Sequence, residues 1–186
     1  MARPRTVSDD AILAATANAV AASGPAGVTL AQIGAGVGLT AAALLKRFGS
    51  KDQLLLALAR HSAEVVPARL AAAPTVAALV DEFVAMAASV RDSAEFANHL
   101  AFLLMDLSVP EFQQVAREYA TAVESAIAVV LRSAAASGEI DPDRIDPGLA
   151  RAIHAAYNGA LITWGMTGAP DGPADQVRAQ LLRVIR

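Results

Sequence analysis

The sequence predicts an all-α fold, and three observations support this fold class. Of the 186 residues 45 are alanine, the residue that enters a helix at the lowest cost in free energy. Aromatic residues make up only 4% of the chain, whereas sandwiches and barrels are rich in aromatic and β-branched side chains. Capping residues, glycine and proline divide the chain into segments with apolar residues at helical spacing. We expect about nine helices.

Four helices are expected in the first third of the chain, at residues 8–23, 29–36, 40–47 and 50–66. Two of them begin with a capping box, Thr29 with Gln32 and Ser50 with Gln53, in which each residue satisfies a backbone N–H of the first turn. Because proline lacks an N–H, Pro67 is expected to kink or end the fourth helix.

Five further helices are expected at residues 75–91, 93–107, 110–137, 147–166 and 173–186. The longest of them carries apolar residues that should face inward: Phe112, Val115, Tyr119, Val123, Ile127, Val130 and Leu131. No apolar run free of charge and proline reaches the roughly 18 to 20 residues that span a bilayer. The first ten residues lack the apolar core of a signal peptide. We therefore expect a soluble, cytoplasmic protein with no membrane partner.

Charge is distributed unevenly along the chain. The net charge is −3, but residues 1–53 carry +2 and residues 54–186 carry −5. This asymmetry favours two domains with these boundaries, of which only the first contacts a polyanion. Cysteine is absent, which excludes disulfides, thiolate metal sites and cysteine catalysis.

The expected second and third helices are joined by Gly36-Val37-Gly38, a turn of the length found in helix-turn-helix units. Apolar residues stand where such a pair would share a small core: Leu30, Ile33, Val37, Leu39 and Leu44. An ordinary helical hairpin inside a bundle would show the same pattern.

A set of residues with family-like spacing runs from Ala11 to Leu58: Ile12-Leu13-Ala14-Ala15, Gly24, Val28 to Ile33, Gly38-Leu39, Leu44, Phe48, Ser50-Lys51 and Leu54. This segment resembles the N-terminal domain of the TetR-like transcriptional regulators. The resemblance implies that the helix at 40–47 enters the major groove and that Thr29 and Lys51 hold DNA phosphates. Both roles are physically reasonable, since helix N-termini and lysine attract phosphate. It also implies that the six remaining helices bind an effector and form a homodimer.

The candidate DNA-binding residues follow from this resemblance: Thr29, Thr40, Ala41, Ala42, Ala43, Leu45, Lys46, Arg47 and Lys51. The chain departs from the family at Leu45, where tyrosine is usual, at Ala41, where lysine is common, and at Gly49, where proline is usual. Alanine methyl groups can pack on the thymine methyl but cannot hydrogen-bond guanine. Arg3 and Arg5 could reach a minor groove, and a solvated terminus explains them equally well.

The family resemblance places an effector among the helices at 75–91, 93–107 and 110–137. The candidate ligand-binding residues are Met86, Phe96, His99, Phe102, Leu103, Met105, Tyr119, Val123 and Asn158, with Asn98 as a further polar candidate. Their mainly aliphatic character favours an apolar small molecule, although core packing explains the same residues. Glu95 and His99 are too few for a metal site, and we expect no cofactor. No nucleophile elbow, phosphate loop or carboxylate pair points to an enzyme.

The last two expected helices carry apolar residues on more than one face: Leu149, Ile153, Ala156, Tyr157, Ala160, Leu161 and Trp164, then Val177, Leu181, Leu182 and Ile185. Such helices favour a two-fold dimer, which would set two recognition helices one DNA turn apart on a palindromic operator. The sequence thus predicts a ligand-responsive DNA-binding regulator, a repressor released by a small apolar effector. The alternatives are a binding protein of this fold with weakened or lost DNA binding and, less favoured, a helical enzyme.

Overall fold

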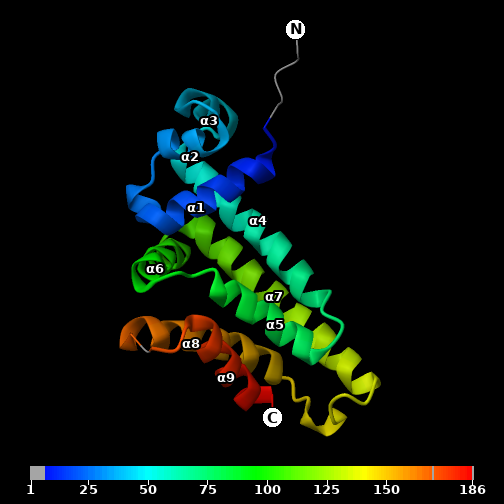
Figure 1. The fold of residues 1–186 in the computed structure, drawn as a ribbon. Coiled ribbons are helices and arrows are strands. Elements are labelled where there is room, and N and C mark those ends of the chain that lie inside the picture. Colours follow the sequence, from blue (N-terminus) through cyan, green and yellow to red (C-terminus); the bar gives the residue numbers. More distant parts are fainter. Residues whose placement is uncertain (1–6, 169, 186) are drawn as a thin grey trace. The chain divides into compact units, whose positions relative to one another are not determined.

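The computed structural model describes residues 7–168 and 170–185, and within them it is all-helical, with no strand (Figure 1). The helices are α1 (Asp9–Gly27), α2 (Leu30–Val37), α3 (Ala41–Phe48), α4 (Lys51–Ala71), α5 (Val76–Ala88), α6 (Ser93–Ser108), α7 (Pro110–Ala136), a 3-10 turn η1 (Pro142–Arg144), α8 (Leu149–Thr167) and α9 (Pro173–Ile185). The predicted fold class and the nine predicted α-helices are confirmed for this part of the chain.

Several helices begin at the residues that the sequence predicted, with the side-chain N-caps that it predicted there. Thr29 and Gln32 form the expected capping box at the start of α2. The Thr40 side chain accepts a hydrogen bond from the N–H of Ala43 at the start of α3, at 3.1 Å. One boundary differs, because α4 does not end at Pro67 and continues to Ala71. Pro67 is itself buried, so tertiary packing offsets the backbone hydrogen bond that proline removes.

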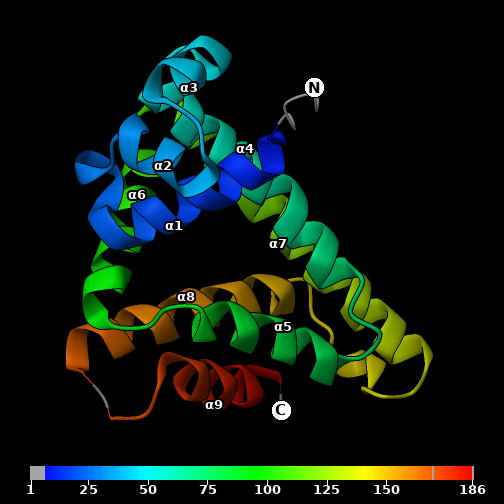
Figure 2. The ribbon, with the colours of Figure 1, turned by 45° about the horizontal axis from the view of Figure 1, so that its top comes forward.

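The helices group into two compact units. The first contains the described chain up to Ser62 together with Ala94–Ala116, and in it α2 packs against both α1 and α3. The second contains Ala63–Ser93 and the described chain from Arg117 onward. In this unit α9 packs against α5 and α8, and the three helices lie side by side in both views (Figure 2). The functional boundary at residues 53 and 54 stays a prediction.

Helix α7 supplies much of the core with its predicted inward side. Six of the seven residues expected there are buried: Phe112, Val115, Val123, Ile127, Val130 and Leu131. Tyr119 is half-buried. Among the described helices, only α7 is long and apolar enough to cross a bilayer by these two criteria. One such helix is weak evidence for a membrane span, because the core helix of a soluble protein passes the same test.

Candidate functional site

Helices α2 and α3 meet in a tight turn that depends on two glycines. Gly38 ends α2 in the left-handed conformation, with a φ of 70°, and the N–H of Leu39 donates to the carbonyl oxygen of Gly34 at 2.8 Å. A Cβ on Gly34 would lie 2.4 Å from the carbonyl oxygen of Leu39. Because no real Cβ approaches an oxygen so closely, glycine at residue 34 sets how near α3 comes to α2.

The helix-turn-helix pair shares the small core that the sequence predicted. Ile33 and Leu44 are fully buried, while Leu30, Val37 and Leu39 are half-buried. With Leu44 directed inward, α3 exposes its other side. We call Thr40, Ala42, Ala43, Leu45 and Lys46 the outward face of α3, and all five are exposed. Leu45 is 50% exposed, which is high for so apolar a side chain.

Arg47, a predicted DNA-binding residue on α3, bonds to the first residue of α1 and to the chain just before it. One guanidinium nitrogen lies 2.6 Å from Oδ1 of Asp9, and another donates to the carbonyl oxygen of Val7 at 2.7 Å. The charge of Arg47 is therefore largely balanced within the protein. Lys46 is exposed and pairs with no described residue, so its ammonium group remains available to an anion.

Thr29 and Lys51, the two predicted phosphate-binding residues, both make bonds within the protein. The Thr29 hydroxyl donates to Oε1 of Gln32 at 2.9 Å and accepts from the N–H of Gln32 at 3.2 Å. Lys51 Nζ donates to the carbonyl oxygens of Pro25 at 3.1 Å and Ala26 at 3.3 Å. Lys51 thereby ties the start of α4 to the end of α1, and one of its three N–H bonds remains for another acceptor.

The first turn of α2 leaves donors for a phosphate. The N–H groups of Leu30 and Ala31 have no acceptor inside the helix, because the first N–H groups of any helix lack one. The Thr29 side chain satisfies the N–H of Gln32 instead. A phosphate at this turn would thus contact the backbone rather than the Thr29 hydroxyl.

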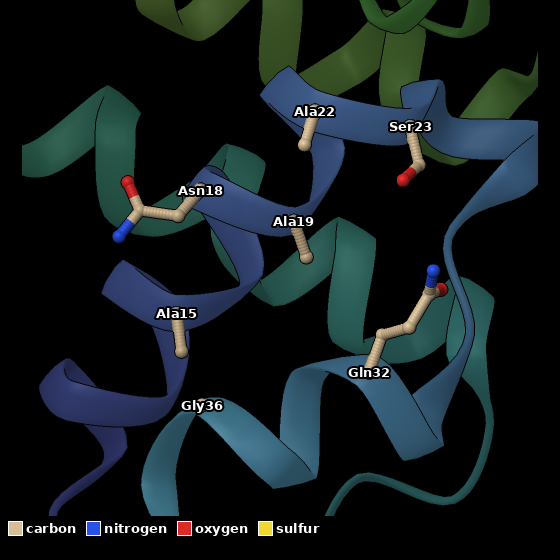
Figure 3. Close-up of a pocket in the computed structure, with 7 residues that line it drawn as sticks. All are labelled: Ala15, Asn18, Ala19, Ala22, Ser23, Gln32 and Gly36. Carbon is tan, nitrogen blue, oxygen red and sulfur yellow. The ribbon is translucent and has the colours of Figure 1, made fainter.

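An open hollow of about 340 Å³, which the sequence did not predict, lies between α1 and α2 (Figure 3). It is lined by Ala15, Asn18, Ala19, Ala22, Ser23, Gln32 and Gly36. Small side chains make this hollow, and no charged group lines it.

The predicted ligand-binding residues fall into two groups. Phe96, His99, Phe102, Leu103 and Met105 belong to the first unit, whereas Met86, Tyr119, Val123 and Asn158 belong to the second. In the first unit the Phe102 ring meets that of Phe112 edge-on, with centroids 6.2 Å apart. Phe96 is buried, while Leu103 is exposed.

In the second unit, the structure brings two of these residues to His154. The Tyr119 ring meets that of His154 edge-on at 6.3 Å, and Nδ2 of Asn158 donates to the His154 carbonyl oxygen at 3.2 Å. Val123 is 1% exposed and packs in the core. His154 was not a predicted site residue; its spacing of four from Asn158 on one helix was the available signal.

Burial shifts the pKa of several groups near these residues. Desolvation lowers the pKa of His154, opposed by the nearby Glu124 carboxylate. Desolvation likewise lowers the pKa of His99, opposed by Glu95. Burial raises the pKa of Tyr157, whose ring lies 4.9 Å from that of Phe83. In the described ranges, no three His, Cys, Asp or Glu side chains cluster in a way that could hold a metal.

Asn98, the further polar candidate, bonds to α1. Its Nδ2 donates to the carbonyl oxygen of Ala21 at 2.8 Å. The bond lies within the first unit, so Asn98 has a structural partner that the sequence did not indicate.

The last two helices are more buried in the single chain than their predicted dimer role suggests. Leu161, Trp164, Val177 and Leu181 are all buried without a second copy. The apolar groups that remain outside are Ile162, Met166 and Leu182, with Met166 82% exposed. If these helices form an interface, it must use these outer residues rather than the buried ones.

The tight turn, the shared core and the exposed outward face define α1–α3 as a helix-turn-helix unit of the DNA-binding class. Residues 12–58 match the family model of the bacterial regulatory proteins of the tetR family. This segment, about a quarter of the chain, is therefore TetR-like, as the sequence pattern predicted. None of the curated proteins matches the sequence.

Solved structures share the fold over nearly the whole chain. A transcriptional regulator from Rhodococcus sp. Rha1 has 18% identity and a TM-score of 0.70, with 96% of each chain covered. A TetR transcription regulator from Haloarcula marismortui ATCC 43049 has 19% identity and a TM-score of 0.70, with 95% of each chain covered. The multidrug binding protein EbrR, complexed with imidazole, has 23% identity and a TM-score of 0.59, with 95% of this chain and 89% of the EbrR chain covered.

Proposed function

We propose that the chain is a cytoplasmic, homodimeric repressor that leaves a palindromic operator when a small, mainly apolar effector binds. The observation that carries the proposal is the outward face of α3, which is exposed, ends in the available cation of Lys46 and belongs to a domain matching a family of DNA-binding regulators. A helix presented in this way fits the major groove.

Phosphate contacts would come from three places around this face. The N–H groups of Leu30 and Ala31 offer the N-terminus of α2 to a phosphate. Lys46 adds a mobile positive charge, and Lys51 has one N–H left after its two bonds to α1. These contacts position the protein on the duplex and carry no sequence information.

The proposed dimer face consists of Gly159 and Ile162 on α8, Met166 one turn further, and Leu182 on α9. All four are exposed in the single chain. Gly159, Ile162 and Met166 recur at spacings of three and four, so they lie along one side of α8. A second copy would remove this apolar stripe from water, and the glycine would allow close helix approach.

The effector is proposed to contact the predicted ligand-binding residues that lie within the first unit. Phe96 and Phe102 on α6 are apolar, which favours a mainly apolar molecule, and His99 on the same helix is a polar group that could orient it. The fold likeness to EbrR, a multidrug binding protein solved with imidazole, is consistent with a small-molecule ligand.

The experiment is a gel shift with the DNA upstream of the chain's own coding sequence, with unrelated duplex of equal length as control. A specific complex that dissociates on adding apolar compounds would support the proposal. Those compounds should also raise the melting temperature by mass action. The rival is a binding protein without DNA affinity, which the exposed Leu45 and the alanine-rich α3 favour. It predicts stabilisation by compounds with no specific complex at any concentration.

A further inference from the structure

Three of the five residues on the outward face of α3 are aliphatic. The face presents the methyl groups of Ala42 and Ala43 and the half-exposed isobutyl group of Leu45. We propose that this face reads the 5-methyl groups of pyrimidines in the major groove, with Leu45 as the residue that determines specificity. The inference rests on the proposed DNA-binding function and adds the class of base that the operator presents.

The polar side chains of α3 have few hydrogen-bonding groups left for DNA bases, because several of them already bond within the protein. Arg47, the residue type best suited to guanine, is held by Asp9 and by the carbonyl oxygen of Val7. The Thr40 hydroxyl already accepts from the N–H of Ala43, which leaves one O–H donor and one lone pair for a base. Ala41, Ala42 and Ala43 have no polar side-chain atom.

Lys46 is the one cation of α3 with no described partner. Its ammonium group is a point charge on a flexible side chain, which suits a phosphate oxygen. Phosphate contacts carry no base information, so this role for Lys46 leaves the reading of bases to the other residues of the outward face.

The exposed side chain of Leu45 fits a methyl group on a base better than a polar group. The C5-methyl group of thymine is the one apolar group that a base pair of unmodified DNA presents in the major groove. Removing the exposed surface of Leu45 from water against such a methyl is favourable, whereas covering a base amino or carbonyl group with Leu45 would leave that group unpaired. The 5-methyl group of 5-methylcytosine occupies the same place, so thymine and 5-methylcytosine share the chemistry.

The test begins with a duplex selected from a random pool by the full-length protein. Each dT is then replaced singly by dU, which removes only the methyl group, and the affinity is measured by fluorescence anisotropy. We expect one or two positions per half-site to lose about fourfold in affinity, the effect of one buried methyl group. At those positions, dC·dG and 5-methyl-dC·dG pairs are compared with dT·dA. If 5-methyl-dC restores the affinity that dC lacks, the protein reads the methyl group on either pyrimidine. If only dT gives full affinity, the base at that position is thymine.

Two variants separate the role of Leu45 from general binding. L45A should bind more weakly and lose the difference between dT and dU, and it should fold because Leu45 is exposed. K46A is the control, which should weaken binding to all duplexes alike and keep that difference. Tight binding by the wild type with no effect of dU at any position would overturn this inference and leave the proposed function intact. Failure of the pool to yield any preferred duplex would instead contradict the proposed function itself, and this inference with it.

Discussion

Asn98 on α6 supplies the hydrogen bond that Pro25 on α1 cannot make. In an uninterrupted helix, the N–H of residue 25 would donate to the carbonyl oxygen of Ala21. Pro25 has no N–H, and Gly24 turns the chain away with a φ of 69° and a ψ of 164°. Nδ2 of Asn98 fills the gap, donating to that carbonyl at 2.8 Å.

Gly24 makes this contact sterically possible. A Cβ on Gly24 would lie 2.8 Å from Oδ1 of Asn98, closer than a real Cβ contact allows. The interruption of α1 at Gly24 and Pro25 therefore forms a contact with Asn98 that links α1 to α6 inside the first unit. Lys51 at the start of α4 donates to the carbonyl oxygens of Pro25 and Ala26, so α4 also contacts this end of α1.

Replacing Asn98 by alanine should lower the free energy of unfolding by about 1 kcal/mol, because the Ala21 carbonyl loses its partner in a half-buried place. The measurement is urea denaturation of wild type and N98A. N18A is the matched control, since Asn18 is exposed on α1 and should change stability by no more than about 0.5 kcal/mol. Equal stability of N98A and wild type would show that water replaces the side chain at no cost.

Two glycines of α2 should respond oppositely to alanine. In G34A the new Cβ would collide with the Leu39 carbonyl, whose oxygen lies 2.4 Å from the ideal Cβ position. We expect a loss of about 2 kcal/mol from this overpacking and weaker DNA binding from a displaced α3. In G36A the Cβ meets only the Cβ of Ala15 at 3.6 Å, an ordinary contact. That variant should gain up to about 1 kcal/mol through helix propensity.

Thermal denaturation of both variants, followed by circular dichroism, checks this prediction. A G34A protein as stable as G36A would mean that the helix-turn-helix turn opens without cost. DNA binding by G36A should match the wild type, since the residue lies outside the outward face of α3.

Much of the fold could be predicted because its signals are local. The caps at Thr29 and Thr40 join residues three apart, and the sequence pattern alone places both partners. Pro67 was harder, because burial from distant parts of the chain decides whether a helix continues past a proline. The close approach of the Leu39 carbonyl oxygen to Gly34 was not predicted, since a glycine inside a helix gives no sign of what lies against it.

The candidate site was predictable only in outline. The sequence predicted α3 as the helix that contacts DNA, with Arg47 and Lys51 among the candidate residues, but it gave no sign of their partners within the protein. Their partners lie 40 residues away at Val7 and 26 residues away at Pro25. The partner of Asn98 is 77 residues away. Contacts at such separations depend on how the helices pack, which periodicity and capping do not encode.

The stability of the protein should fall below neutral pH in part through His154. Burial lowers its pKa in the folded protein, while the unfolded value is about 6.5. Above pH 7 the imidazole is neutral in both states, so it has no effect. As the pH falls below about 6.5, the unfolded state takes up the proton first, and the free energy of unfolding decreases.

The contribution of His154 should be less than about 1 kcal/mol, because water reaches part of the ring and screens the effect. Urea denaturation at pH 7.5 and pH 5.5 measures it, with H154Q expected to show a smaller difference between the two values than wild type. His99 shifts in the same direction, so part of the difference should remain. H61Q serves as a control for the replacement of a histidine by glutamine. The prediction fails if H154Q keeps the full difference.

The proposed dimer face makes a prediction about neighbouring residues of α8. Ile162 is exposed, whereas Leu161 beside it is buried in the single chain. I162E should therefore give a folded monomer with weaker operator binding, because charge on the apolar stripe opposes association. L161E should unfold or strongly destabilise the chain, since it buries an unpaired charge. Sedimentation at tens of micromolar distinguishes the two, with circular dichroism to report folding. A dimeric I162E would exclude this face.

The salt dependence of DNA binding should report which cations contact phosphates. Arg47 is paired with Asp9, so among the described residues of α3 and the first turn of α4 we expect Lys46 and Lys51 each to neutralise a phosphate. A dimer using both in each subunit should show a slope of log affinity against log salt of about −4, at roughly 0.9 per phosphate. K46A should flatten the slope by about 2 without loss of stability, because Lys46 is exposed. K51A should flatten the slope similarly and also lower the stability of the protein, because the bonds of Lys51 to Pro25 and Ala26 are lost.

R47A is the control: it should leave the slope unchanged and reduce stability slightly. Salt titrations with operator and unrelated duplex test all three, and a flatter slope in R47A would show that DNA displaces Asp9 from the guanidinium group.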